Sequence, residues 1–305
     1  MASLGAGGPD MMQKAKTVMG QMKAAMSGDA GKQRMLGVYV SLAQDVQRGM
    51  QSATPETRLQ MSGVFESFLM KLSQGSNELS VLNWVAETFA SLGEGLQDGD
   101  ETNPNAQKYF ERSAAAFENI LNQSDLPIAM QTQTKARLAG ISAKFGDRDK
   151  ALTLYKDVLR KNPTAINVQV AAARLLQDWA EDEPKRYDEA INGIKSDGPK
   201  PLVWGWAKTA LVASQNQQFR QAFFQARYEL AHCQFQMAQT QSGAAKDKLI
   251  AATLKSITKT AGLYPTLGGP QQLQKYDALL KQVQQAAGKP ATGLQSLRLN
   301  QSDSP

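Results

Sequence analysis

The sequence predicts an all-α protein built from antiparallel helical hairpins. Apolar residues recur at spacings of three and four along almost the whole chain, which is the period of one helix face. No stretch alternates strictly between apolar and polar residues, as a half-buried strand would. Short clusters rich in Gly, Pro, Asn and Asp interrupt the pattern at intervals that fit helices of ordinary length. Short helices with short connections pack as a bundle or as a stack of hairpins, and internal similarity decides between the two.

Composition excludes several classes of protein. Of the 305 residues 42% are hydrophobic and 20% are charged, which indicates a packed chain rather than a disordered one. The single cysteine, Cys233, excludes an internal disulfide framework and any multi-cysteine metal site. The single histidine, His232, excludes the repeated histidine ligands of most catalytic zinc centres. We therefore expect no metal and no cofactor.

The first residues and the apolar runs bear on the cellular compartment. The start of the chain lacks the charged and apolar regions of a secretory signal. No apolar run approaches the roughly 20 residues that a membrane-spanning helix needs. The compartment stays open, with the cytoplasm favoured if these residues are the full-length chain. The oligomeric state also stays open.

Eleven breaks divide the chain into about a dozen helices. Several of them carry start signals, for example Thr54 as N-cap with Pro55 at the first helical position and Glu56 in the first turn. The breaks lie at Ser27–Gly31, Ser52–Pro55, Gly75–Asn77, Gly95–Asn105, Ser124–Pro127, Gly146–Asp147, Asn162–Thr164, Glu181–Pro184, Asp197–Pro201, Ser242–Ala244 and Pro265–Pro270.

Four segments are expected from the distribution of residue types. Residues 1–29 form a Met-rich segment with one amphipathic helix, which either packs on the hairpins or binds a partner helix or an anionic surface. Residues 30–131 carry degenerate hairpins, residues 132–287 carry the clearest hairpins, and residues 288–305 form a disordered tail rich in Gly, Ser, Pro and Asn. The apolar face of this helix consists of residues spaced three and four apart, namely Met12, Ala15, Met19, Met22 and Met26.

The most informative window is residues 132–165. A small residue at Ala139 lets two antiparallel helices approach closely, and Gly146 ends the first of them. The small side chain of Ala151 leaves room for the neighbouring helix, and Tyr155 packs between the two helices. Pro163 terminates the second helix. The full set of these positions is Leu138, Ala139, Gly146, Ala151, Tyr155, Val158, Leu159 and Pro163.

This window resembles the tetratricopeptide repeat, a helical hairpin of about 34 residues. It departs from the family at Lys135, where Trp is common, and at Ser142, where Tyr is common. Residues 78–131 and 166–199 resemble the repeat at fewer positions, and residues 200–287 at fewer still. The resemblance implies an α-solenoid of antiparallel helical hairpins, wound as a right-handed superhelix, with a concave wall that grips a peptide or a helix of another protein.

The resemblance also implies which residues line that wall. The first helix of each hairpin faces the groove in this family, so three basic side chains, Arg137, Lys144 and Arg174, are expected to pair with a carboxylate of a ligand. The Lys and Asn set by which some members clamp a terminal carboxylate is missing at its offsets. The lining positions are Gln133, Arg137, Gly140 and Lys144 in the first hairpin and Asn167, Val170, Arg174 and Gln177 in the next.

Two loop motifs each lack residues that their ligand requires. Asp98–Asn105 is similar to a calcium loop, but Asn103 stands where Gly is required and Tyr109 stands where Glu is required. We therefore expect a solvated loop. Gly28–Gln33 contains the Gly-Lys pair of a phosphate loop but has Met26 in place of the first Gly and no Ser or Thr after the lysine.

Catalytic groups are also not apparent. His232 and Cys233 are neighbours on a helix and point about 100° apart, so we interpret them as a buried thiol beside a partly buried imidazole. Trp204 and Trp206 are expected in the core, and the acidic run 181–183 is expected in a solvated loop between helices. The sequence therefore predicts a non-catalytic scaffold for protein–protein interaction.

The charge distribution supports an alternative function. Residues 201–305 carry 11 basic and 4 acidic side chains, which is the whole positive excess of the chain. Such a surface favours an acidic partner, and nucleic acid or another acidic polymer is the second candidate. Lysines scattered on solvated helix faces would give the same count. A steep fall of DNA affinity with salt would distinguish the two.

Overall fold

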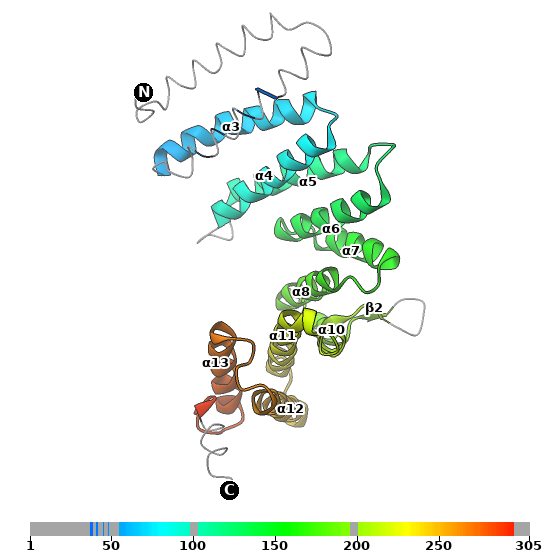
Figure 1. The fold of residues 1–305 in the computed structure, drawn as a ribbon. Coiled ribbons are helices and arrows are strands. Elements are labelled where there is room, and N and C mark those ends of the chain that lie inside the picture. Colours follow the sequence, from blue (N-terminus) through cyan, green and yellow to red (C-terminus); the bar gives the residue numbers. More distant parts are fainter. Residues whose placement is uncertain are drawn as a thin grey trace, which may run out of the picture. The chain divides into compact units, whose positions relative to one another are not determined.

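The fold is all-α. The computed structural model describes residues 55–97, 103–195 and 201–295, together with Gly37, Val38, Ser41, Asp45 and Arg48. Eleven α-helices, one 3₁₀ turn and two very short strands make up this part of the chain (Figure 1). The predicted all-α class is confirmed. The predicted Met-rich helix within residues 1–29 lies outside the described residues.

The described helices follow the predicted breaks, except that the break between α10 and α11 at residues 214–219 was not predicted. Contacts divide the chain into two compact units, residues 1–134 and residues 135–305, and each is described by itself. The boundary falls within α6. The helices are α3 (Pro55–Gly75), α4 (Leu79–Gln97), α5 (Pro104–Leu121), α6 (Ile128–Lys144), α7 (Arg148–Lys161), α8 (Ile166–Asp182), α9 (Arg186–Asn192), α10 (Gly205–Ala213), α11 (Arg220–Gln239), α12 (Gly243–Leu263) and α13 (Pro270–Ala286), with a 3₁₀ turn η1 (Gln217–Phe219).

In the first unit, α4 and α5 pack closely against each other. A Cβ at Gly93 would lie 2.7 Å from the ring of Phe110, so only glycine lets this ring lie against α4. The buried hydroxyl of Ser113 donates to the carbonyl of Ala86 at 2.8 Å, which joins the two helices again. Phe110 and Phe117 are both fully buried and form the apolar face of α5.

In the second unit, α6 and α7 form the hairpin that the sequence predicted most clearly. Gly146 adopts a φ of +90° in the turn, and the Asp147 side chain accepts a hydrogen bond from the backbone N–H of Lys150 to cap α7. A Cβ at Gly140 would lie 3.6 Å from the Tyr155 hydroxyl, which is ordinary contact. The Lys135 ammonium donates to the Asp157 carboxylate at 2.8 Å, so a basic residue stands across this seam in place of an aromatic one.

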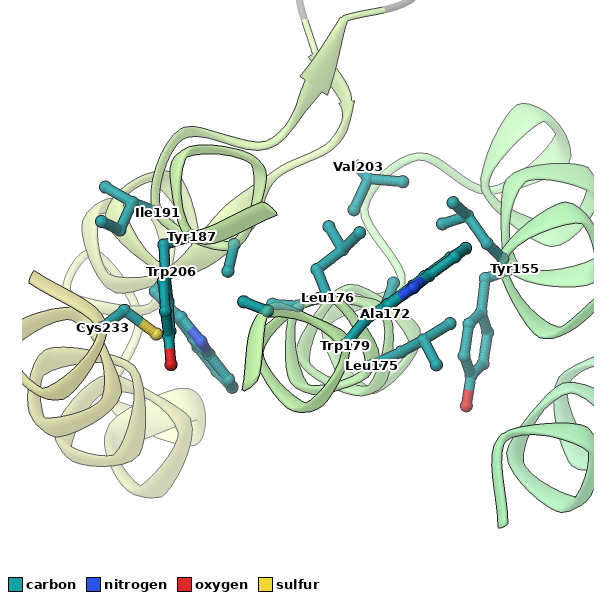
Figure 2. Close-up of a cluster of buried hydrophobic side chains, with 14 of the residues drawn as sticks. Tyr155, Ala172, Leu175, Leu176, Trp179, Tyr187, Ile191, Val203, Trp206 and Cys233 are labelled. Carbon is teal, nitrogen blue, oxygen red and sulfur yellow. The ribbon is translucent and has the colours of Figure 1, made fainter. Parts of the chain in front are cut away.

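The main core of the second unit surrounds α8. Figure 2 shows Leu175 and Trp179 of α8 on the side of Tyr155 from α7, whereas Trp206 lies on the opposite side next to Cys233 of α11. Helix α8 is therefore apolar on two sides. Both apolar sides must be covered by other helices. Helix α7 covers one side, and α9, α10 and α11 cover the other.

A short β-ribbon interrupts the helices, which the sequence did not predict. Strands β1 (Ile194–Lys195) and β2 (Pro201–Val203) pair antiparallel between α9 and α10. Strands of two and three residues are too short to show an alternating pattern. The buried side-chain amide of Gln169 donates to the carbonyl of Leu202 at 3.0 Å and accepts from the backbone N–H of Trp204 at 2.8 Å. The ribbon is thereby tied to α8.

Two further expectations need correction. Glu181 and Asp182 belong to the last turn of α8 rather than to a loop, because the helix continues to Asp182 before Glu183 caps it.

The disordered tail was expected from residue 288, but the backbone N–H of Gly293 donates to Gln284 and that of Leu294 donates to Asp277, both at 2.8 Å. Residues 288–294 therefore fold back onto α13. Residues 296–305 lie outside the described residues.

The approach of α10 to the end of α9 generates a prediction. Gly205 has a φ of +60°, and a Cβ there would lie 2.4 Å from the backbone nitrogen of Gly193 and 2.8 Å from the carbonyl oxygen of Ile191. Gly205→Ala should lower the free energy of unfolding by about 2 kcal/mol or more, because backbone atoms cannot move aside cheaply. Urea denaturation measures the change.

Gly140→Ala is the matched control for Gly205→Ala. Its new methyl group enters ordinary contact with Tyr155 within a helix, so it should leave stability unchanged or raise it by about 0.5–1 kcal/mol. Equal losses in the two variants would contradict the role assigned to Gly205.

Candidate functional site

The predicted lining residues of α6 lie on one exposed face. Gln133, Arg137 and Lys144 are all exposed and are spaced four and seven residues apart, which places them on the same side of the helix. Arg137 also lies near the buried Tyr155, where its positive charge opposes the increase that burial produces in the phenol pKa, to about 12. This face of α6 therefore presents two cations and an amide to solvent.

The predicted lining residues of α8 divide into two kinds. Asn167 is exposed at the start of the helix, and Val170 is half-buried. Arg174 is also half-buried, and its guanidinium forms an ion pair with the Glu229 carboxylate of α11 at 2.5 Å. Gln177 is only 5% exposed. The structure therefore directs the second half of this face toward α11.

Glu229 is the centre of a buried polar network. Its side chain is 4% exposed and accepts from Arg174 on one oxygen and from the Gln177 amide on the other, the latter at 2.8 Å. The carbonyl oxygen of Gln177 in turn accepts from the indole N–H of Trp206 at 2.7 Å. Both ends of the Gln177 amide are used internally, so Gln177 is removed from the proposed partner-binding residues.

The imidazole of His232 lies at the edge of this network. Its ring stacks on Tyr228 with centroids 6.0 Å apart and lies 3.5 Å from the Gln177 amide nitrogen. Burial lowers the pKa of His232, although the nearby Glu229 carboxylate acts in the opposite direction. Burial also raises the pKa of the Cys233 thiol. The two groups are therefore neutral near pH 7, and the sequence interpretation of a buried thiol beside a partly buried imidazole is confirmed.

An open groove lies among α10, α11 and α12, and sequence reasoning missed it. Its volume is about 460 Å³, within the range of ligand-binding pockets. Two leucines on its wall, Leu211 and Leu263, are 61% and 63% exposed. The lining residues are Ala207, Ala210, Leu211, Ser214, Phe223, Arg227, Leu230, Lys259, Thr260, Leu263 and Tyr264.

The remaining sequence motifs lie in the core, at a helix cap or outside the described residues. Trp204 and Trp206 are 5% and 0% exposed, which confirms that they belong to the core. The Asn103 side chain caps α5 by accepting from the backbone N–H of Asn105, whereas residues 98–102 and 28–33 lie outside the described residues. Within residues 55–97, 103–195 and 201–295, no cluster of three His, Cys, Asp or Glu side chains is placed to hold a metal ion.

Comparisons with known proteins name no family. The sequence matches no protein-family model and no curated protein. None of the helices that the structure describes has both the length and the apolar character needed to cross a bilayer. Any functional conclusion therefore rests on the geometry of the helices themselves.

The buried carboxylate generates a prediction about stability. Glu229→Ala removes the acceptor for Arg174 and Gln177, and it should lower the free energy of unfolding by about 3 kcal/mol because two donors lose their partner in a buried site. Arg174→Ala should also be clearly destabilising, because it leaves the buried Glu229 carboxylate without its cation and with only the Gln177 hydrogen bond. Denaturant unfolding of both single variants and the double variant measures the coupling.

Glu181→Ala is the control for Glu229→Ala. Glu181 is an exposed glutamate on α8, so its removal should change stability by no more than about 0.5 kcal/mol. A loss at Glu229 as small as the loss at Glu181 would show that the network contributes little.

The lowered pKa of His232 generates a prediction about pH. Because the folded state holds the imidazole neutral, the unfolded chain binds a proton more readily, and the stability from this group is lost as pH falls below about 6.5. His232→Gln should therefore lose less stability between pH 7 and pH 5 than the wild type. The difference between the two unfolding curves cancels the other titrating groups, and parallel curves would contradict the assignment.

Proposed function

We propose that the chain is a non-catalytic scaffold of tetratricopeptide type that binds a peptide or helix of a partner protein on the exposed face of its first helices. The observation that carries the proposal is the exposed α6 face with Gln133, Arg137 and Lys144. Asn167 at the start of α8 is exposed as well. These positions are among those that the resemblance to the repeat family implies line its groove.

The packing of successive hairpins supports the same proposal. Helix α10 packs on both helices of the preceding hairpin, α8 and α9, and α11 packs on α9 as well. This is the neighbour-to-neighbour contact by which helical repeats stack. The small residues Ala139 of α6 and Ala151 of α7 are fully buried where the two helices were expected to approach. Stacked hairpins place first helices next to one another and so build an extended surface.

The chemistry of the face indicates what it binds. Arg137 and Lys144 provide two positive charges on one side of α6, and amides at positions 133 and 167 can bond to a peptide backbone. Arg174 is already paired with Glu229, so it contributes less to a ligand than the sequence indicated. We propose an extended segment with acidic side chains as the ligand class.

Affinity capture with charge-reversed variants tests the proposal. The intact chain and an Arg137→Glu, Lys144→Glu variant are each used as bait, and their bound proteins are identified and compared. We expect partners of the α6 face to be lost from the variant, since each reversed charge costs a favourable contact and adds a repulsive one, for a weakening of about tenfold or more.

The matched control is a Lys161→Glu, Lys195→Glu variant. Both residues are exposed and lie on other elements, so the net charge changes equally while the α6 face stays intact. Partners that bind the control but not the α6 variant support the proposal. Identical partners for all three baits would show that the α6 face is not the binding surface.

A further inference from the structure

The groove among α10, α11 and α12 contains a cation with only neutral partners among the described residues. Arg227 is half-buried, and its guanidinium donates to the hydroxyl of Thr260 and lies within 3.4 Å of the hydroxyl of Ser256. Within the described part of the chain no carboxylate forms an ion pair with it. A guanidinium on an apolar wall normally has a carboxylate or phosphate opposite it. Arg227 is therefore fixed by two hydroxyl groups in a place suited to an incoming anion.

A stripe of lysines leads along α12 to the same groove. Lys248, Lys255 and Lys259 are exposed and lie seven and four residues apart, so they share one face of the helix. Leu263, four residues further, continues this face to the groove wall. Among the residues that the structure describes, none of the three lysines forms an ion pair. Asp247 is the one acidic residue in the sequence of α12.

The groove also exposes apolar surface. Leu211 on α10 and Leu263 at the end of α12 are more than half exposed although both line the groove, and the floor contains the buried Phe223 and Leu230. Large aliphatic side chains exposed on either side of a depression favour an apolar ligand that covers both. A depression with a buried aromatic floor and exposed leucines at its edge fits the apolar face of a helix.

We propose that this groove binds an acidic amphipathic helix of a partner protein. The apolar face of that helix covers Leu211 and Leu263 and fills the groove, and a Glu or Asp beside that face pairs with Arg227. Further acidic residues one and two turns along the ligand lie opposite Lys259 and Lys255. This site is separate from the α6 face and does not depend on the proposed function. Nucleic acid matches the lysines but not the leucines. An anionic membrane matches both, but Leu211 and Leu263 line a groove, which a flat bilayer surface does not fill.

A binding assay with designed peptides tests the proposal on the full chain. The probe is a fluorescent, helix-forming peptide of about 15 residues with Leu at the helical spacing of three and four and Glu flanking the leucines, made in four registers. Its counterpart has Gln in place of every Glu. We expect at least one acidic register to bind, and its Gln counterpart to bind about tenfold more weakly or less.

Variants of the chain locate the site. Leu211→Ala with Leu263→Ala should weaken the acidic peptide by about tenfold, and Lys259→Glu should weaken it and reduce its salt dependence. Ile128→Ala, which removes another exposed aliphatic side chain, and Lys289→Glu, which makes the same charge change on the segment after α13, should leave affinity unchanged. The melting temperature of each variant separates loss of binding from loss of folding.

Two results would overturn the proposal. The first is no binding by any acidic register, or equal loss in the groove and control variants. The second is a competition assay in which random-sequence DNA or vesicles of anionic lipid bind more tightly than the peptide and depend on Lys259, whether or not they also depend on Leu211 and Leu263. That outcome would assign the lysine stripe to the alternative that the charge of residues 201–305 suggests. The α6 face variant serves here as a further control, because it should bind the peptide normally.

Discussion

The burial of the Glu229 carboxylate is the constraint on which the second unit depends. A charged group in a protein interior costs several kcal/mol unless it is paired and its lone pairs are satisfied. The ion pair with Arg174 and the hydrogen bond from Gln177 meet this requirement, and both donors come from α8. Because Gln177 also accepts from Trp206, three helices must hold one relative position for the network to close.

A second buried amide on α8 extends the same constraint to the β-ribbon. Gln169 is fully buried and bonds to the carbonyls of Pro163 and Leu202 as well as to the backbone N–H of Trp204. The segment that leads into α10 is therefore fixed at its start by Gln169 and at Trp206 by Gln177. Helices α10 and α11 form walls of the groove. The buried amides of Gln169 and Gln177 therefore help to determine the shape of the groove, although neither amide lines it.

Local signals explain how much of the fold could be predicted. Gly146 and Pro163 mark the ends of α6 and α7, and small residues such as Ala139 and Ala151 mark close helix contacts, so the hairpin and its core could be inferred from the sequence. The β-ribbon could not, because its strands are shorter than one alternating pattern. The folded segment at residues 288–294 was missed because its composition resembles that of a flexible tail, while its ordering comes from Gln284 on α13.

In the candidate sites, the sequence predicts exposure only where that exposure does not depend on partners far away in the chain. Gln177 has the spacing of a groove-lining residue, and nothing near it in sequence reveals the carboxylate 52 residues away that it binds. Leu211 and Leu263 are large apolar residues of the kind that is usually buried. Their exposure follows from how three helices pack, which the sequence does not reveal. Arg137 and Lys144 could be identified because their exposure depends on one helix alone.

The location of Cys233 has a chemical consequence. This single sulfhydryl lies at 0% exposure beside Trp206, in the seam between α11 and its neighbours. An alkylating reagent can reach the sulfur only when α11 separates from α8 and α10. The rate of alkylation therefore measures how often α11 separates from these helices. A cysteine introduced anywhere on the surface would react first and could carry a spectroscopic label with little background from the native residue.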